Sequence, residues 1–404
     1  MNLLYRDKQF YKFSLYGFLK NLRFFEPFLI LFFLEKGFSF FQIGLLISIR
    51  EISNYILEIP TGFVADIKGR KKSMLFSMIS YIFSFFIFFF FNSFPLMIMA
   101  MIVFALGEAF RSGTHKALIL SYLEKNNSLD KRTEYYGKTR SFSQIGSAFN
   151  ALIAAGLVFY TGKYSIIFIA SVVPYILNFF NLLSYPNYLD SKIKDKSRKE
   201  FFKDFFSLFK LQDTRSGILN ASIFDSFFKT SKEYLQPILV TIALSIPLLT
   251  NYDIQTRSSV LIGIVYFFLF LLTSLASRNS KRASELFSDK GKFLNFTYLT
   301  GGIFFIFIWG VQNLKLEYLS VVIFILFYIL YNLRRPVNVS YLSEKFPKEL
   351  MASGLSLEAQ MRMIFISVLA PLMGFLVDNF GIPNSFLAAG IAMMVLIIFS
   401  RIKE

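Results

Sequence analysis

Long apolar runs, separated by short polar turns, follow one another along the whole chain. Most runs reach about 20 residues, the length that a helix needs to cross a hydrocarbon core of ~30 Å. They lack the alternating ten-residue segments of a membrane β-barrel. Because backbone N–H and C=O groups find no water in lipid, each span must pair them internally, as a helix does. The pattern therefore predicts an all-α integral membrane protein with twelve transmembrane helices.

The predicted spans are residues 12–34, 40–64, 73–92, 95–120, 138–160, 163–185, 217–245, 257–277, 293–313, 317–341, 353–377 and 383–401. The segment "MNLLYRDKQFYKF" leads directly into the first span, so a cleavable signal is not expected. Composition agrees with a membrane protein: 55% of the 404 residues are hydrophobic and 17% are charged, whereas about 25% are charged in soluble proteins. The chain has no cysteine, which excludes disulfides and thiol chemistry.

The distribution of Lys and Arg predicts the topology. If the N-terminus is cytoplasmic, about 30 of these residues fall on the cytoplasmic side. The opposite side then holds only Lys36, Lys163, Arg257 and Lys315. Cytoplasmic loops carry such an excess, so we expect a multi-pass protein of the cytoplasmic (inner) membrane with both termini in the cytoplasm. The net charge of +17 is then loop charge that faces anionic lipid, and a nucleic-acid partner is not expected.

A long hydrophilic stretch follows the sixth span and divides the chain. We predict a six-helix bundle over residues 1–185, a cytoplasmic linker over 186–216 and a second six-helix bundle over 217–404. An amphipathic stripe in the linker is predicted to lie in the membrane interface, with partner binding as the alternative. The stripe consists of Phe201, Phe202, Phe205, Phe206 and Phe209.

Short matches indicate that the second half repeats the first. Ile43-Gly44 recurs as Ile262-Gly263, Ser121-Tyr122-Leu123 as Ser340-Tyr341-Leu342, and Gly162 as Gly381. All three pairs are 219 residues apart. Internal repeats of this kind are typical of secondary transporters, which bind their solute where the repeats meet.

A dense polar turn separates the second and third spans. It contains Gly62, Asp66, Gly69, Arg70 and Lys71, at spacings that resemble the signature loop of the major facilitator superfamily. Ile67 departs from that signature, which usually has a basic residue there. The resemblance covers essentially the whole chain and implies that this motif is a cytoplasmic gate that latches the two halves together. The alternative is a turn that only sets topology, but such a turn would not need the acid and the glycines.

Charged residues inside the predicted spans are the candidate site residues, because charge in a membrane is costly and usually faces a cavity or another charge. Several lie three or four positions apart on one helical face. They are either structural ion pairs or cavity groups; we expect that not all are structural, since such pairs can be replaced by apolar packing. The candidates for binding an anionic solute are Arg23, Arg50, Arg111, Lys229, Lys232, Arg335 and Arg362.

Four acids are candidates for proton coupling: Glu26, Glu51, Glu108 and Asp225. Glu26 is the first choice, because Pro27 follows it and can kink the span near the middle of the membrane. The single histidine, His115, lacks an evident carboxylate partner in the sequence, so we expect a structural or gate contact rather than a proton relay.

These features lead to a functional hypothesis. We expect a secondary active transporter that moves a small anionic, zwitterionic or drug-like solute by proton-coupled alternating access, with a slight preference for efflux taken from the family. The alternatives are a flippase for lipids or lipid-linked molecules and a non-transporting membrane receptor or scaffold. The sequence contains no Walker loop for ATP and no metal-ligand cluster, so we expect no enzyme activity, cofactor or metal. A monomer in the bilayer is expected, with a solute and H⁺ as partners.

Overall fold

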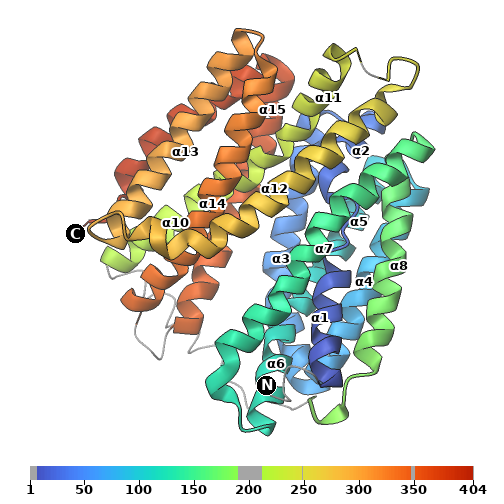
Figure 1. Cartoon of the computed structure of the whole chain (residues 1–404), viewed down its shortest axis with the longest axis vertical. Coiled ribbons are helices and arrows are strands. Elements are labelled where there is room, and N and C mark those ends of the chain that lie inside the picture. Colours follow the sequence, from blue (N-terminus) through green and yellow to red (C-terminus); the bar gives the residue numbers. More distant parts are fainter. Residues whose placement is uncertain (1–6, 190–211, 248, 347–350, 404) are drawn as a thin grey trace. The chain divides into compact units, whose positions relative to one another are not determined.

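The computed structural model describes residues 7–189, 212–247, 249–346 and 351–403. The predicted amphipathic segment of the linker lies outside these residues. Every long element that they form is an α-helix, which confirms the all-α prediction. Figure 1 shows the helices in chain order. They are α1 (Lys8–Lys20), α2 (Leu29–Glu35), α3 (Phe40–Lys68), α4 (Arg70–Phe90), α5 (Phe94–Arg111), α6 (Thr114–Lys125), α7 (Arg132–Thr161), α8 (Ile166–Leu183), α10 (Gln212–Ser231), α11 (Leu235–Ser245), α12 (Ile254–Ser284), α13 (Lys290–Asn313), α14 (Glu317–Lys345) and α15 (Met351–Ser400).

Eight segments of the described residues are long and apolar enough to cross a membrane. This number does not by itself establish the predicted count of twelve. The first and seventh predicted spans are each interrupted by a short 3-10 helix, η2 (Glu26–Phe28) and η5 (Lys232–Tyr234). The second predicted span, residues 40–64, is continuous within α3 but carries three charged residues, Arg50, Glu51 and Glu58. The last two predicted spans form one element, α15, which is kinked at Gly381 (φ 76°).

The chain divides into two compact units. Unit 1 consists of Met1–Lys36, Ile49–Asp195 and Leu249–Phe270, and unit 2 of Gly37–Ser48, Lys196–Leu248 and Leu271–Glu404. Each unit therefore includes a short piece of the other sequence half: the start of α12 belongs to unit 1 and the start of α3 to unit 2. The two predicted six-helix halves remain a prediction.

Serine hydroxyls join α4 to α5 in unit 1. Within lipid, helices gain little from apolar contact with each other, and small or polar residues at the interface hold them together. The hydroxyls of Ser73, Ser77 and Ser84, all fully buried, donate across the interface over distances of 2.8, 2.7 and 2.9 Å. Their acceptors are the carbonyl oxygens of Phe110, Gly107 and Ala100, in this order.

Glycines let α1 approach α7 closely, also in unit 1. A Cβ atom at Gly146 of α7 would lie 2.6 Å from the carbonyl oxygen of Phe18. Beside this contact, the side-chain amide of Asn21 donates to the carbonyl of Ser143 over 2.7 Å. Asn178 and Asn181 of α8 donate in the same way to carbonyls of α1. The first helix is thus held by backbone contact and by buried amides.

Unit 2 uses the same chemistry around a buried cation. Ser222 and Ser226 of α10 donate to carbonyl oxygens of α15, over 3.0 and 3.1 Å. Arg334 of α14 is 1% exposed and lies 4.4 Å above the ring of Phe224. Its guanidinium donates to neutral oxygens only, among the bonds that the structure describes: those of Asn220, Leu294 and Thr297. These bonds pair both Nη atoms of the buried guanidinium, as a buried charge requires, and they join α10, α13 and α14.

The close approach of α1 and α7 can be tested with one added methyl group. We expect Gly146→Ala to lower the melting temperature of the purified protein, because its Cβ would collide with backbone that no rotamer change can move; overpacking costs about 1–3 kcal/mol. Gly156→Ala on the same helix is the matched control, since a Cβ there meets no atom within 4 Å. This control should be neutral or slightly stabilising, because Ala favours a helix over Gly by about 1 kcal/mol. Equal melting temperatures for the two variants would contradict the packing described.

Candidate functional site

The polar cluster of unit 1 is built around the carboxylate of Glu108. Oε1 lies 2.5 Å from a guanidinium nitrogen of Arg23, and Oε2 lies 2.6 Å from one of Arg111. The hydroxyl of Tyr81 donates to Oε1 over 2.6 Å and accepts from Nε of Arg111 over 3.2 Å. One acid therefore holds two cations and a phenol in a closed hydrogen-bonded network.

Interrupted helices and helical spacing position these groups. α1 ends at Lys20, and the non-helical residues that follow carry Arg23 across to α5. Arg111 stands three positions after Glu108, on the same face of α5. Glu26 lies 3.7 Å from Arg23, but its side chain is 41% exposed. The two guanidinium groups outnumber the buried carboxylate by one, so the cluster has a positive excess that Glu26 balances only in part.

A second candidate pair of unit 1 lies on α3. Two guanidinium nitrogens of Arg50 contact Oε1 of Glu51, over 2.8 and 3.2 Å. Arg50 also lines a small, mainly aromatic pocket with Phe25, Leu29, Phe88, Met101, Phe104 and Phe168. Arg50 therefore faces apolar side chains as well as its acidic neighbour.

In unit 2, one arginine is shared by two acids. Nη1 of Arg362 lies 2.7 Å from Oε1 of Glu358, one helical turn away on α15, and 3.7 Å from Oδ2 of Asp225 on α10. The three side chains are between 7% and 13% exposed. The cluster thus joins α10 to α15. Its charges are opposite to those of the cluster in unit 1, where two arginines share one acid.

The other cations predicted in unit 2 lie along α10, η5 and α14. Lys232 is paired with the neighbouring Glu233, whose second oxygen accepts from Gln236 over 2.8 Å. The guanidinium of Arg335 lies 6.0 Å from the centre of the Tyr331 ring. Lys229 is half-buried on α10, one turn after Asp225.

The predicted gate motif lies at the junction of α3 and α4. Gly69 has φ 101°, a conformation that side chains rarely adopt, and a Cβ at Gly62 would meet no atom within 4 Å. Arg70 donates to the hydroxyl of Ser121 over 3.1 Å, and Lys71 donates to the carbonyl of Tyr185 over 2.6 Å. The side chain of Asp66 lies outside the described residues. The described contacts of both cations with Ser121 and Tyr185 are within unit 1; the latch between halves remains a prediction.

His115 lies in an aromatic environment. Its ring stacks on Tyr16, with centroids 3.9 Å apart and an angle of 21°, and Phe13 packs against it edge-on. Nε2 lies 3.5 Å from the hydroxyl of Tyr185, at the limit of a hydrogen bond. These contacts fit the structural role that was expected from the sequence.

Sequence reasoning did not select three residues that the structure places in these clusters. Tyr81 and Tyr331 were overlooked because tyrosine is abundant in this chain, and nothing in the sequence distinguishes a buried phenol. Glu358 carried a signal, since it stands four positions before Arg362 in an apolar segment. That spacing could have placed it among the candidate acids.

The chain is similar over nearly its whole length to known proteins. A family model described as Major Facilitator Superfamily matches residues 18–367. A curated relative, the uncharacterized MFS-type transporter YxaM of Bacillus subtilis (strain 168), is 23% identical over 386 residues, which cover 94% of this chain and 91% of the relative.

Solved transporter structures share the fold. A point mutant of the nucleoside transporter NupG has a TM-score of 0.80 at 14% identity, covering 97% of this chain and 98% of its own. A POT family transporter in complex with 5-aminolevulinic acid has a TM-score of 0.72 at 14% identity, covering 97% and 94%. A D-xylose–proton symporter has a TM-score of 0.70 at 14% identity, covering 98% of both chains. These proteins are transporters rather than enzymes, and at such identities the likeness establishes the fold alone.

The Glu108 cluster makes a prediction about stability. Glu108→Gln leaves two largely buried guanidinium groups without their counter-ion, which we expect to cost about 3–5 kcal/mol in the free energy of unfolding. Tyr81→Phe removes two hydrogen bonds but keeps both ion pairs of Glu108, and should cost about 2 kcal/mol. Melting temperatures in detergent would show whether Glu108→Gln destabilises the protein more than Tyr81→Phe does.

The control for this prediction is the exposed pair of Glu134 and Lys138 on α7, which are 2.8 Å apart. Glu134→Gln should change stability by less than about 1 kcal/mol, because water screens such pairs. A Glu108→Gln protein as stable as the Glu134→Gln protein would contradict the central role of Glu108.

Proposed function

The chain belongs to the major facilitator superfamily, and from this premise we propose that it is a proton-coupled transporter of a small anionic or zwitterionic organic solute. The observation that carries the proposal is the pair of opposite clusters: two arginines around Glu108 in unit 1, and two acids around Arg362 in unit 2. We further propose twelve spans in two six-helix halves, residence in the cytoplasmic membrane and both termini in the cytoplasm.

The cation-rich cluster of unit 1 is proposed to hold the negative group of the solute. Arg23 and Arg111 have planar guanidinium groups with several donors each, which suit carboxylate or phosphate oxygens. Glu108 orients both of them and keeps them close together in the absence of solute. The POT family transporter that shares this fold was solved with 5-aminolevulinic acid, a solute of the chemical class proposed here.

The acid-rich cluster of unit 2 is proposed to carry the proton. Arg362 contacts Glu358 and reaches Asp225 at a longer distance, so the two acids share its guanidinium. If one of the two acids takes up a proton and loses its charge, the guanidinium of Arg362 would pair with the other acid, which is still ionised. The solved D-xylose–proton symporter of the same fold supports a coupled mechanism of this kind. Among the acids predicted from the sequence, Asp225 is therefore the one we assign to coupling, with Glu358 as its partner.

Alternating access needs contacts that close on one side of the membrane and can open again. In unit 2, the start of α3 packs on α15: a Cβ at Gly44 would collide with the backbone at Ala370, and one at Gly374 with the backbone at Phe40. The carboxylate of Asp378 accepts from the backbone N–H groups of Phe40 and Phe41, over 2.9 and 2.8 Å. This carboxylate caps the first turn of α3, where the helix dipole favours negative charge.

A matching contact occurs in unit 1 between α7 and the start of α12. A Cβ at Gly263 would collide with Ala155 and lie 3.5 Å from the carbonyl of Ala151. Gly263 and Ala151 are each 219 residues away from Gly44 and Ala370, the residues of the contact in unit 2. We propose that these two repeat-related contacts form the gate on the side of the membrane opposite to the basic loops. The Arg70 and Lys71 motif would then serve the gate on the cytoplasmic side.

Proton coupling can be separated from solute binding in proteoliposomes. A thermal-shift screen of wild-type protein against carboxylates, amino acids and phosphorylated compounds first supplies a solute. We expect Glu358→Gln and Asp225→Asn to lose accumulation driven by an imposed pH gradient, by about tenfold or more, while keeping solute exchange without a gradient. Arg111→Gln should weaken both activities, because it removes a solute contact. Gradient-driven uptake that survives in both acid variants would contradict the assignment of the proton site.

The gate at Asp378 can be followed with one reactive thiol, because the chain has no cysteine of its own. Ser48 is buried, and its hydroxyl donates to the carbonyl of Ser367 over 2.6 Å within the contact of α3 with α15. We expect a thiol introduced by Ser48→Cys to react several times faster with an impermeant maleimide when Asp378→Asn is added. Asp289→Asn, at the cap of α13, is the control and should leave the rate unchanged. An unchanged rate in the Asp378→Asn protein would exclude a gate at this contact.

A further inference from the structure

A groove runs along unit 2 between α13 and the C-terminal end of α15. It encloses about 990 Å³. Its wall is apolar and open to the surroundings: Phe296 is 53% exposed and Ile398 is 73% exposed, and Leu299 and Ile397 complete the surface. One end of the groove has a different character, since Lys292, Arg401 and Lys403 line it together with a single acid, Asp289.

Buried contacts fix the position of these cations. The side-chain amide of Asn295 pairs with both backbone groups of Ile402, donating to its carbonyl over 2.8 Å and accepting from its N–H over 3.1 Å. Ile402 is 5% exposed and belongs to the apolar core of unit 2 with Phe293 and Leu294. Because Ile402 is anchored inward, the exposed side chains of Arg401 and Lys403 on either side of it border the groove.

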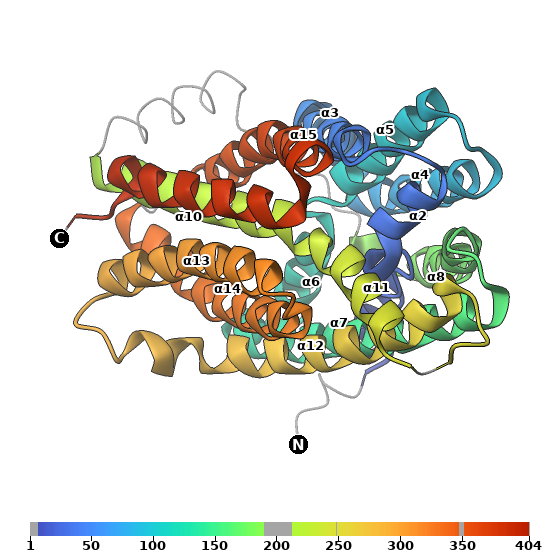
Figure 2. The ribbon, with the colours of Figure 1, turned by 90° about the horizontal axis from the view of Figure 1, so that it is seen from above.

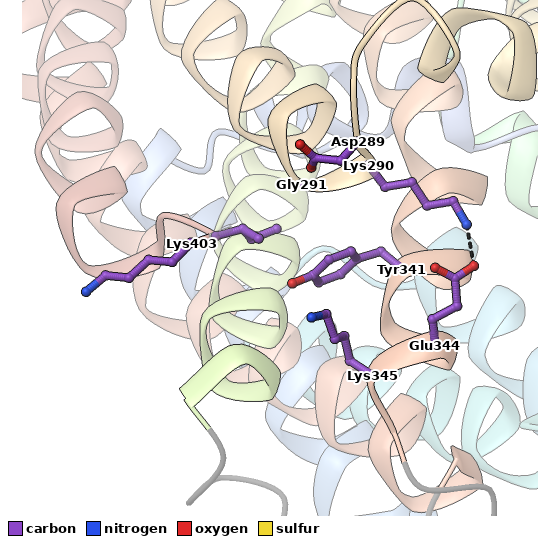
Figure 3. Close-up of a pocket in the computed structure, with 8 residues that line it drawn as sticks. Asp289, Lys290, Gly291, Tyr341, Glu344, Lys345 and Lys403 are labelled. Carbon is purple, nitrogen blue, oxygen red and sulfur yellow. Dashed lines mark hydrogen bonds and ion pairs between the residues drawn. The ribbon is translucent and has the colours of Figure 1, made fainter.

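The polar end continues into a second pocket of about 440 Å³, which shares Asp289, Gly291, Ile402 and Lys403 with the groove. Figure 3 shows this pocket, with Lys345 beside Tyr341, Lys403 directed away from Tyr341 and Lys290 directed to Glu344. Figure 2 shows α13 beside α15 in the view from above. Four lysines thus border the two connected pockets, in addition to Arg401.

The equivalent lysines of the two sequence halves make different contacts. Lys71, which is 219 residues before Lys290, donates to the carbonyl of Tyr185 and to Asn187, both just after α8. Lys290 instead donates to Ser340 over 2.9 Å and to Glu344. In the part of the chain that the structure describes, these two equivalent lysines thus contact different elements.

We propose that this groove binds one anionic phospholipid, with its phosphodiester on Lys292, Arg401 and Lys403 and an acyl chain along Phe296, Leu299 and Ile398. Two features together select this ligand. Basic pockets between transmembrane helices on the cytoplasmic side suit anionic headgroups, and the apolar wall that continues from the cations would be left unfilled by a free anion. The proposal does not depend on the solute that the protein transports.

Native mass spectrometry of the full-length protein tests the proposal. The purified protein is incubated with an equimolar mixture of dioleoyl phosphatidylglycerol and dioleoyl phosphatidylcholine, and the ratio of the two adducts is measured. We expect wild-type protein to retain phosphatidylglycerol preferentially, and the Arg401→Ala/Lys403→Ala protein to lose this preference by at least threefold. Leu299→Trp should also lower it, because the indole fills the apolar part of the groove and leaves every cation in place.

The matched control is Lys281→Ala/Arg282→Ala on α12, which removes two exposed cations away from the groove and should keep the wild-type ratio. Melting temperatures establish that each variant is folded. A ratio that Arg401→Ala/Lys403→Ala does not change overturns the proposal, and so does an equal loss in the α12 control, which would indicate unspecific attraction. Complete displacement of phosphatidylglycerol by millimolar glycerol phosphate would show a site for the headgroup alone and would also overturn it.

Discussion

The ion cluster at Glu108 is the constraint on which the arrangement of unit 1 depends. A carboxylate in a membrane is tolerated only with partners, and here the partners come from three different segments: Arg23 after α1, Tyr81 of α4 and Arg111 of α5 itself. The interruption of the first span becomes intelligible on this basis. A continuous helix through residues 21–25 would place Arg23 elsewhere. The break in the helix is therefore what allows Arg23 to pair with Glu108.

Lipid as a solvent explains the remaining contacts. Because the surroundings are as apolar as the helix faces, close packing and hydrogen bonds decide which faces meet. Serine hydroxyls between α4 and α5, amides between α1 and α8, and glycines facing backbone in both units all answer this requirement. The same need for hydrogen bonds between helices is met by a charged group at Arg334, whose buried guanidinium donates to neutral oxygens and so joins three helices.

The sequence predicted the helices and the local charge pairs well. The predicted spans fall on helical segments of the described residues, although the last two share the element α15, because long apolar runs have only one economical conformation in lipid. Arg111 and Glu108 stand three positions apart and are paired, and Arg362 and Glu358 stand four positions apart and are paired, which helical spacing favours. Contacts between helices could not be predicted in this way. Asp225 stands four positions before Lys229 in the sequence, yet it reaches Arg362 on α15; this contact depends on how α10 and α15 pack rather than on spacing.

The attachment of Ile402 to α13 has a practical consequence for anyone who alters this end of the chain. Asn295 recognises the backbone of Ile402 rather than its side chain, and Ile402 in turn covers Phe293 and Leu294. Deleting the residues from Ile402 onward would remove two hydrogen bonds from the half-buried side-chain amide of Asn295. It would also expose the apolar side chains of Phe293 and Leu294. A shortened form of the protein should therefore keep Ile402.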